Sequence, residues 1–92
     1  MRENDSGLFS STFKRAFKKR IAGQKDLEEK FWLRVEIFTA DPFDPRLRTH
    51  KLSGKLSELW SFSLACDLRV IFHFLPQNRA MFENIGSHDE VY

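Results

Sequence analysis

The sequence contains a single cysteine, Cys66, and therefore no disulfide can form within the chain. One unpaired thiol is typical of proteins in a reducing compartment. No apolar run approaches the roughly 20 residues that a membrane-spanning helix needs. The first residues are polar and lack the apolar segment of a secretion signal. These absences predict a soluble, cytoplasmic protein without a membrane partner.

Prolines and glycines are also few, with three and four among 92 residues, and no repeat, low-complexity tract or linker divides the chain. A chain of this length forms one domain, so we predict a single domain over residues 1–92. A domain this small buries only a limited core. Ten phenylalanines and two tryptophans supply the large apolar side chains for it.

The net charge is only +2, but the basic residues are concentrated in two blocks. Five lie between Phe13 and Arg20, and four more lie with His50 between Arg46 and Lys55, with no acidic residue in either block. Two basic blocks on one small domain favour a polyanionic partner. The alternative is that these side chains only make exposed faces soluble.

Two helices are predicted before residue 41. Apolar residues from Phe13 to Ile21 recur at helical spacing behind a cap at Ser10 or Ser11. Gly23 is expected to end this helix. Asp26 and Glu29 resemble a capping box that opens a second helix, and the prolines that follow Asp41 end it.

The period then changes to two, which indicates short strands at 60–64, 70–75 and 80–85 with a turn at 76–78. A weaker strand candidate at 7–10 is placed at an edge of the sheet. We therefore predict an α+β fold, in which an N-terminal helix hairpin packs on one face of a small twisted antiparallel sheet of three to four strands.

Several side chains in the second half of the chain suit RNA cleavage without a metal. That reaction needs a base for the 2′-OH, an acid for the departing 5′-oxygen, and cations for the charged intermediate. His50, Asp67 and His88 offer proton transfer, and Lys51 and Arg69 offer positive charge. Tyr92 offers a surface on which a base can stack. The histidines and the cysteine lack metal-ligand spacing, so we expect no metal and no cofactor.

Four stretches carry a resemblance to a known family: residues 41–43, 49–54, 67–72 and 85–92. They resemble the RelE/ParE toxin superfamily, specifically its RelE and YafQ-like mRNA interferase branch. This resemblance implies a toxin of a type II toxin–antitoxin system that inhibits translation by cleaving mRNA in the ribosomal A site. It also implies a small antitoxin that wraps the toxin, a monomeric free toxin, and a heterotetrameric complex.

The resemblance also implies roles for individual residues. It places His50 and Asp67 in acid/base positions, either of which can be the base, and makes His88 the general acid. Arg69 matches a phosphate-stabilising arginine, and Tyr92 matches a terminal aromatic residue. Lys51, Lys14 and Lys18 are the expected substrate-binding bases. One departure is Ser63, which stands where YafQ-like enzymes carry a further histidine.

Two other functions remain open from the sequence. A ParE-like toxin shares the fold but inhibits DNA gyrase and does not cut RNA. An inactive antitoxin-binding relic is favoured by Ser63. Each proposed site residue also has a plain structural alternative, as a loop histidine, a turn aspartate or an arginine in an ordinary salt bridge.

Overall fold

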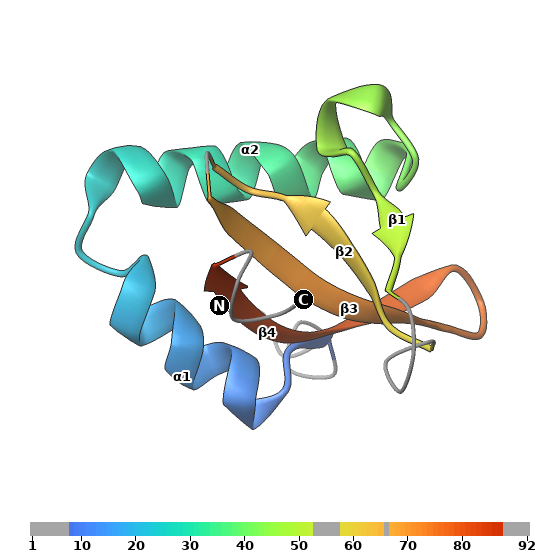
Figure 1. Cartoon of the computed structure of the whole chain (residues 1–92), viewed down its shortest axis with the longest axis horizontal. Coiled ribbons are helices and arrows are strands. Elements are labelled where there is room, and N and C mark those ends of the chain that lie inside the picture. The colour runs from blue at the N-terminus through green and yellow to red at the C-terminus, as the bar shows by residue number, and fades with distance from the viewer. Residues whose placement is uncertain (1–7, 53–57, 66, 88–92) are drawn as a thin grey trace.

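The computed structural model describes residues 8–52, 58–65 and 67–87, and Figure 1 shows how its elements are arranged. The predicted site residues His88 and Tyr92 lie outside these ranges. Four antiparallel strands form one sheet in the order β1-β2-β3-β4, preceded by two helices. The predicted α+β architecture is confirmed. The elements are α1 (Ser11–Arg20), α2 (Lys25–Ala40), the 3₁₀ turn η2 (Pro45–Leu47), β1 (His50–Lys51), β2 (Trp60–Ser63), β3 (Leu68–Leu75) and β4 (Arg79–Ser87).

The start of α1 is fixed by Ser10, one of the two predicted caps. Its Oγ accepts a hydrogen bond from the Phe13 N–H at 3.0 Å and donates one to the Glu83 carbonyl at 3.1 Å. The Ser10 N–H donates to the Phe82 carbonyl at 2.9 Å. One residue therefore caps the helix and ties its first turn to β4.

Replacing Ser10 by alanine is expected to lower the free energy of unfolding by about 1 kcal/mol, because the helix loses a side-chain cap. The measurement is urea denaturation followed by circular dichroism. Ser11→Ala is the matched control, since Ser11 is exposed and is not the cap. Its effect should stay within about 0.5 kcal/mol. Equal losses in the two variants would show that Ser10 does not act as the cap.

The loop between the helices differs from the predicted capping box. Gln24 occupies the cap position of α2 and makes no side-chain cap hydrogen bond. Glu28, instead of Glu29, reaches back to the loop, where its Oε2 accepts from the Gly23 N–H at 3.1 Å. Gly23 has a φ of 88°, a left-handed conformation that glycine adopts without strain. The predicted break at Gly23 is confirmed, and α2 ends at Ala40 as expected.

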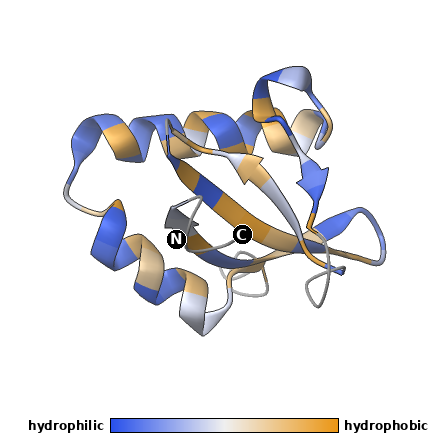
Figure 2. Cartoon of the chain, viewed as in Figure 1, coloured by the Kyte–Doolittle hydropathy of each residue, from blue (hydrophilic) through white to orange (hydrophobic). Residues whose placement is uncertain are grey.

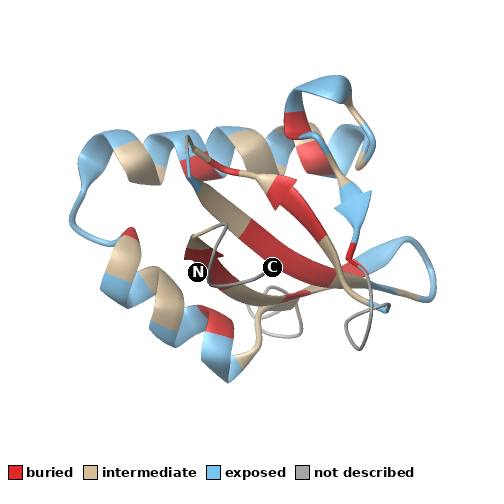
Figure 3. Cartoon of the chain, viewed as in Figure 1, coloured by how far each residue is buried: buried red, intermediate tan, exposed pale blue. Residues whose placement is uncertain are grey.

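Aromatic rings from both helices and the sheet form the core. The Phe38 ring lies 5.3 Å from Phe62, 4.9 Å from Phe72 and 5.6 Å from Phe82, measured between ring centroids. The Phe13 ring reaches Phe82 at 5.5 Å. The two helices therefore cover the same face of the sheet. Figure 2 shows a central strand that is hydrophobic over much of its length, and Figure 3 shows burial concentrated in β2, β3 and β4.

The fourth strand is not where the sequence pattern placed it. The weak candidate at 7–10 contributes one isolated parallel bridge, between Phe9 and Phe82, because the chain turns into α1 at Ser10. β1 is the fourth strand instead, and it pairs with β2 through only two residues, His50 and Lys51. Two residues are too few for an alternating pattern to be visible. No helix within the described residues is long and apolar enough to cross a membrane.

Candidate active site on the outer face of the sheet

The face of the sheet opposite the helices carries most of the polar strand residues. Side chains directly opposite each other on paired strands share a face, and the face alternates along each strand. Phe62 and Val70 pair within the core, so the next pair along, Ser63 and Arg69, lies on the opposite side. We call this side the outer face. It carries two cross-strand rows: Ser63, Arg69 and Gly86, and His50, Ser61, Ile71 and Asn84.

His50 stands at the edge of this face with a defined ring orientation. Its Nδ1 lies 3.1 Å from the carbonyl oxygen of Arg48. A carbonyl oxygen only accepts hydrogen bonds, so Nδ1 carries the proton in this contact. His50 is exposed at the edge of the sheet.

The loop before β1 holds His50 in place through a set of hydrogen bonds. Asp44 accepts two bonds from the Arg46 guanidinium, both at 2.9 Å, and a third from the Arg46 N–H at 2.9 Å. The Arg34 Nη1 donates to the Arg46 carbonyl at 2.6 Å, which fastens the loop to α2. The Thr49 hydroxyl donates to the Pro42 carbonyl at 2.5 Å. Hydrogen bonds at Thr49 and at Arg46 therefore hold the loop that precedes β1.

The pKa of Asp44 is lowered to about 2 by hydrogen bonds from the Arg46 side chain, then by the hydrogen bond from the Arg46 backbone N–H, and to a smaller extent by the charge of Arg46. A lowered pKa means that folding favours the carboxylate. The stabilisation is therefore complete above the ordinary pKa of 3.8 and is lost as the pH falls towards 2. We expect NMR titration of the Asp44 carboxyl carbon to show a midpoint of about 2.

Arg46→Gln should raise the pKa of Asp44, while leaving it below 3.8 because the backbone N–H of residue 46 still donates. Arg48→Gln is the charge-matched control and should leave the titration of Asp44 unchanged. A midpoint that does not move in Arg46→Gln would contradict the assigned cause.

Arg69 and Asp67 lie at one end of the outer face. Arg69 is half-buried on β3, and its Nη1 donates to the Leu68 carbonyl at 3.3 Å. Asp67 is exposed in the turn between β2 and β3, where the Leu64 N–H donates to the Leu68 carbonyl at 2.9 Å. Strand spacing and rise separate the Cα atoms of His50 and Arg69 by roughly 12 Å. The outer-face residues between them, Ser61 and Ile71, are buried.

The remaining predicted residues are distributed differently. Lys51 pairs with Trp60, and Trp60 pairs with Phe72, which faces the helices. Lys51 is therefore on the helix-covered side of the sheet, and His50 is on the other side. Lys14 borders an apolar cleft between the helices, beside Phe17 and Trp32. Lys18 is exposed on α1. The structure thus brings His50 and Arg69 onto one face, with Asp67 at its end, and does not gather these lysines with them.

Arg15 and Lys19 were missed by the sequence analysis. They line a depression between α1 and β4, next to Asn84 and Gly86 of the outer face. In the sequence, every base between Phe13 and Arg20 has the same claim to a binding role. Only the docking of α1 against β4 decides which of them approach the sheet.

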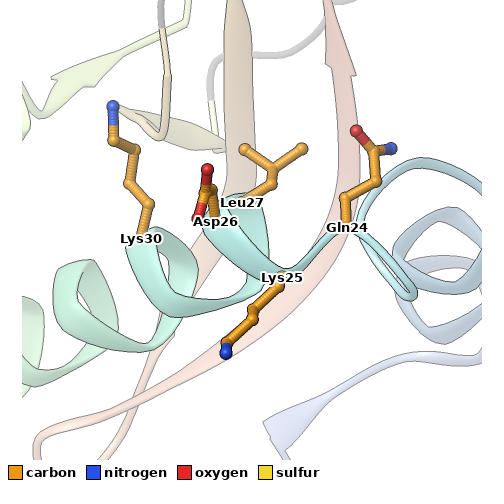
Figure 4. A pocket seen from close by; sticks show the side chains of 5 residues that line it. All are labelled: Gln24, Lys25, Asp26, Leu27 and Lys30. Carbon is orange, nitrogen blue, oxygen red and sulfur yellow. The ribbon is translucent and has the colours of Figure 1, made fainter.

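His73 is explained by the structure without a catalytic role. Its Nδ1 lies 2.8 Å from the Glu83 Oε2, which makes a pair across β3 and β4. Among the described residues, no three His, Cys, Asp or Glu side chains gather as a metal site. The depression at the start of α2 does not form a convergent site either. Figure 4 shows the Lys25 side chain pointing away from Asp26 and Lys30.

Comparison with known proteins gives likenesses in structure only. No family model and no curated protein matches the sequence. A YoeB/ParE toxin from Agrobacterium tumefaciens superposes with a TM-score of 0.74 and 13% identity, covering 88% of this chain and 95% of that one. A metal-bound toxin from Helicobacter pylori gives 0.69 and 24%, covering 91% and 94%.

YafQ in the DinJ–YafQ complex of E. coli gives a TM-score of 0.63 and 19% identity, covering 92% of this chain and 94% of that one. At these identities the likeness establishes the fold. The chain has the RelE/ParE-like fold of these toxins, which confirms the resemblance drawn from the sequence at the level of the fold.

Proposed function

We propose that this chain is the toxin of a type II toxin–antitoxin system and that it cleaves mRNA on the ribosome without a metal. The observation that carries the proposal is the outer face, on which the register of the strands places His50 and Arg69. The fold supports the toxin role, because the similar structures are toxins.

The proposed reaction is an attack of the ribose 2′-oxygen on the adjacent phosphorus. His50 Nε2 or the Asp67 carboxylate takes the 2′-OH proton, and the bond from phosphorus to the 5′-oxygen breaks. His88 gives a proton to that oxygen, and the products are a 2′,3′-cyclic phosphate and a 5′-hydroxyl. Arg69 stabilises the charge on the phosphoryl oxygens. Tyr92 offers a stacking surface for a base.

Ser63 limits the number of groups that can transfer protons. It faces Arg69 across β2 and β3, on the same side as His50. A serine hydroxyl has no pKa suited to base catalysis near neutral pH. The base is therefore His50 or Asp67 alone, and we expect a slower or differently selective enzyme than one with a histidine at this position.

The proposed protein partner is a small antitoxin in the cytoplasm. The DinJ–YafQ complex supports this proposal, since it pairs a toxin of the same fold with another protein. Exposed bases on α1, including Lys14 and Lys18, suit an acidic segment that folds on binding. We propose a monomeric free toxin and a heterotetrameric complex.

The test is a purified translation reaction programmed with one defined mRNA. Addition of the chain should produce fragments with 5′-hydroxyl and cyclic-phosphate or 3′-phosphate ends. A parallel supercoiling assay with purified DNA gyrase should show no inhibition. Intact mRNA together with inhibited gyrase would replace this proposal with the ParE-like function. Intact mRNA with active gyrase would favour the inactive relic.

A further inference from the structure

We propose that the RNA strand held at Arg69 continues across Gly86 to α1, where Arg15 and Lys19 bind a neighbouring phosphate of the same strand. The inference rests on the proposed ribonuclease function and adds a second anchor for the substrate. The site is the depression between α1 and β4, with a volume of about 460 Å³. We call it the α1–β4 depression. Its lining residues are Thr12, Arg15, Ala16, Lys19, Arg20, Asn84, Ile85 and Gly86.

The chemistry of this lining suits a phosphate. Three of its side chains are basic, Thr12 and Asn84 add a hydroxyl and an amide, and none of the described residues that line it is acidic. Arg15 and Lys19 are four residues apart, so they project from the same side of α1. Both are exposed, and no carboxylate of the described residues forms an ion pair with either one.

The acid nearest to this site along β4 is already engaged. Glu83 pairs with His73 at 2.8 Å, and its backbone carbonyl accepts from the Ser10 hydroxyl. The same Ser10 contact fixes the first turn of α1 against β4. The bases of α1 are therefore held beside the sheet by the cap, which makes the depression a built feature of the fold.

Gly86 connects the depression to the candidate active site. It is the direct partner of Arg69 across β3 and β4, and it lines the depression as well. A paired residue lies about 5 Å away at Cα, and glycine places no side chain between the two sites. Gly86 itself is buried in the sheet. A strand whose phosphate meets Arg69 would run along this edge of the sheet, beside Gly86, and reach Arg15 and Lys19 within its neighbouring nucleotides.

Helix α2 provides a matched control. Lys25 and Lys30 are exposed on α2 and do not line the α1–β4 depression. Each pair can be changed to glutamine with equal loss of charge and little change in helix propensity. Arg15→Gln/Lys19→Gln tests the depression, and Lys25→Gln/Lys30→Gln tests general attraction by exposed helix bases.

The experiment measures binding of fluorescein-labelled, 2′-O-methyl single-stranded oligonucleotides, which resist cleavage, to the full-length chain. We expect wild type to bind a nonanucleotide more tightly than a trinucleotide. Arg15→Gln/Lys19→Gln should lose most of that gain, and its salt slope should fall by about 0.7 because one phosphate contact is removed. Over a fourfold rise in salt, the wild type should then lose roughly 2.6-fold more affinity than the variant.

Lys25→Gln/Lys30→Gln should keep the length gain, and thermal unfolding should confirm that both variants are folded. Equal losses in the two double variants would overturn the proposal, as would a full length gain in Arg15→Gln/Lys19→Gln. A wild type without any length gain would also overturn it and would assign the bases to ribosomal RNA or the antitoxin. The translation reaction described above judges the nuclease function separately, so the two failures are distinguishable.

Discussion

Arg69→Gln is expected to slow mRNA cleavage by about 10²–10³-fold, the usual loss when one charge-stabilising group is removed from a phosphoryl or acyl transfer site. Arg69 lies on the outer face opposite Ser63 and Gly86, where a phosphodiester would also meet His50. Glutamine keeps the length of the side chain but offers no positive charge. The measurement is the rate of fragment formation in a purified translation reaction.

Arg79→Gln is the charge-matched control for this experiment. Arg79 is exposed at the other end of the β3–β4 hairpin, where its Nε donates to the Pro76 carbonyl at 3.1 Å. Its loss should change the rate by less than threefold, which is about 0.6 kcal/mol. Undiminished cleavage by Arg69→Gln, or an equal loss in Arg79→Gln, would remove Arg69 from the reaction.

Phe72→Ala is expected to lower the free energy of unfolding by about 3–5 kcal/mol, because it leaves a cavity in the centre of the aromatic core. Phe72 is fully buried, with its ring centroid 4.9 Å from Phe38 and 5.9 Å from Phe62. A small domain has a total stability of about 5–15 kcal/mol, so this loss is large. Urea denaturation followed by tryptophan fluorescence gives the value.

Phe74→Ala is the matched control on the same strand. Phe74 lies on the same side of β3 as Phe72 but is 39% exposed, with rings of Phe43 and Trp60 beside it. Truncating a half-exposed ring removes less apolar surface from the folded core. Its cost should be less than half that of Phe72→Ala. Equal losses of unfolding free energy in the two variants would show that Phe74 contributes to the core as much as the buried Phe72 does.

The parts of the fold that the sequence predicted are those with a repeated pattern. Apolar spacing from Phe13 to Ile21 and the alternation around Phe62 and Phe72 each reflect burial of one face, and the structure confirms the helix and both strands. The prediction that the phenylalanines and both tryptophans supply the core holds for most of them, but Trp32, Phe43 and Phe74 are exposed.

The parts that the sequence could not predict depend on tertiary contacts. β1 contains two residues, so no alternation marks it, and the strand at 7–10 is replaced by one bridge because Ser10 caps α1. The flank of α1 that approaches β4 depends on how the helix docks. For that reason Lys14 and Lys18 were named, while Arg15 and Lys19 line the depression beside Gly86.

The geometry of the candidate site could be predicted only in part from the sequence. The motif at 49–54 marked His50, but the orientation of its ring comes from the Arg48 carbonyl, and that contact depends on the loop held by Asp44 and Arg46. Arg69 and Ser63 were singled out separately, and the register of β2 and β3 makes them direct partners. His88 and Tyr92 stay predictions, since they lie outside the described residues.

The central claim is that this outer face cleaves mRNA during translation. The most direct test maps the 5′ ends of cellular mRNA after brief induction of the wild-type chain and, in parallel, of His50→Ala and Arg69→Gln. We predict new 5′ ends inside translated codons for wild type and a strong loss of those ends in Arg69→Gln. Growth arrest by the wild type without new 5′ ends, or the same ends at full strength from both variants, would contradict the account.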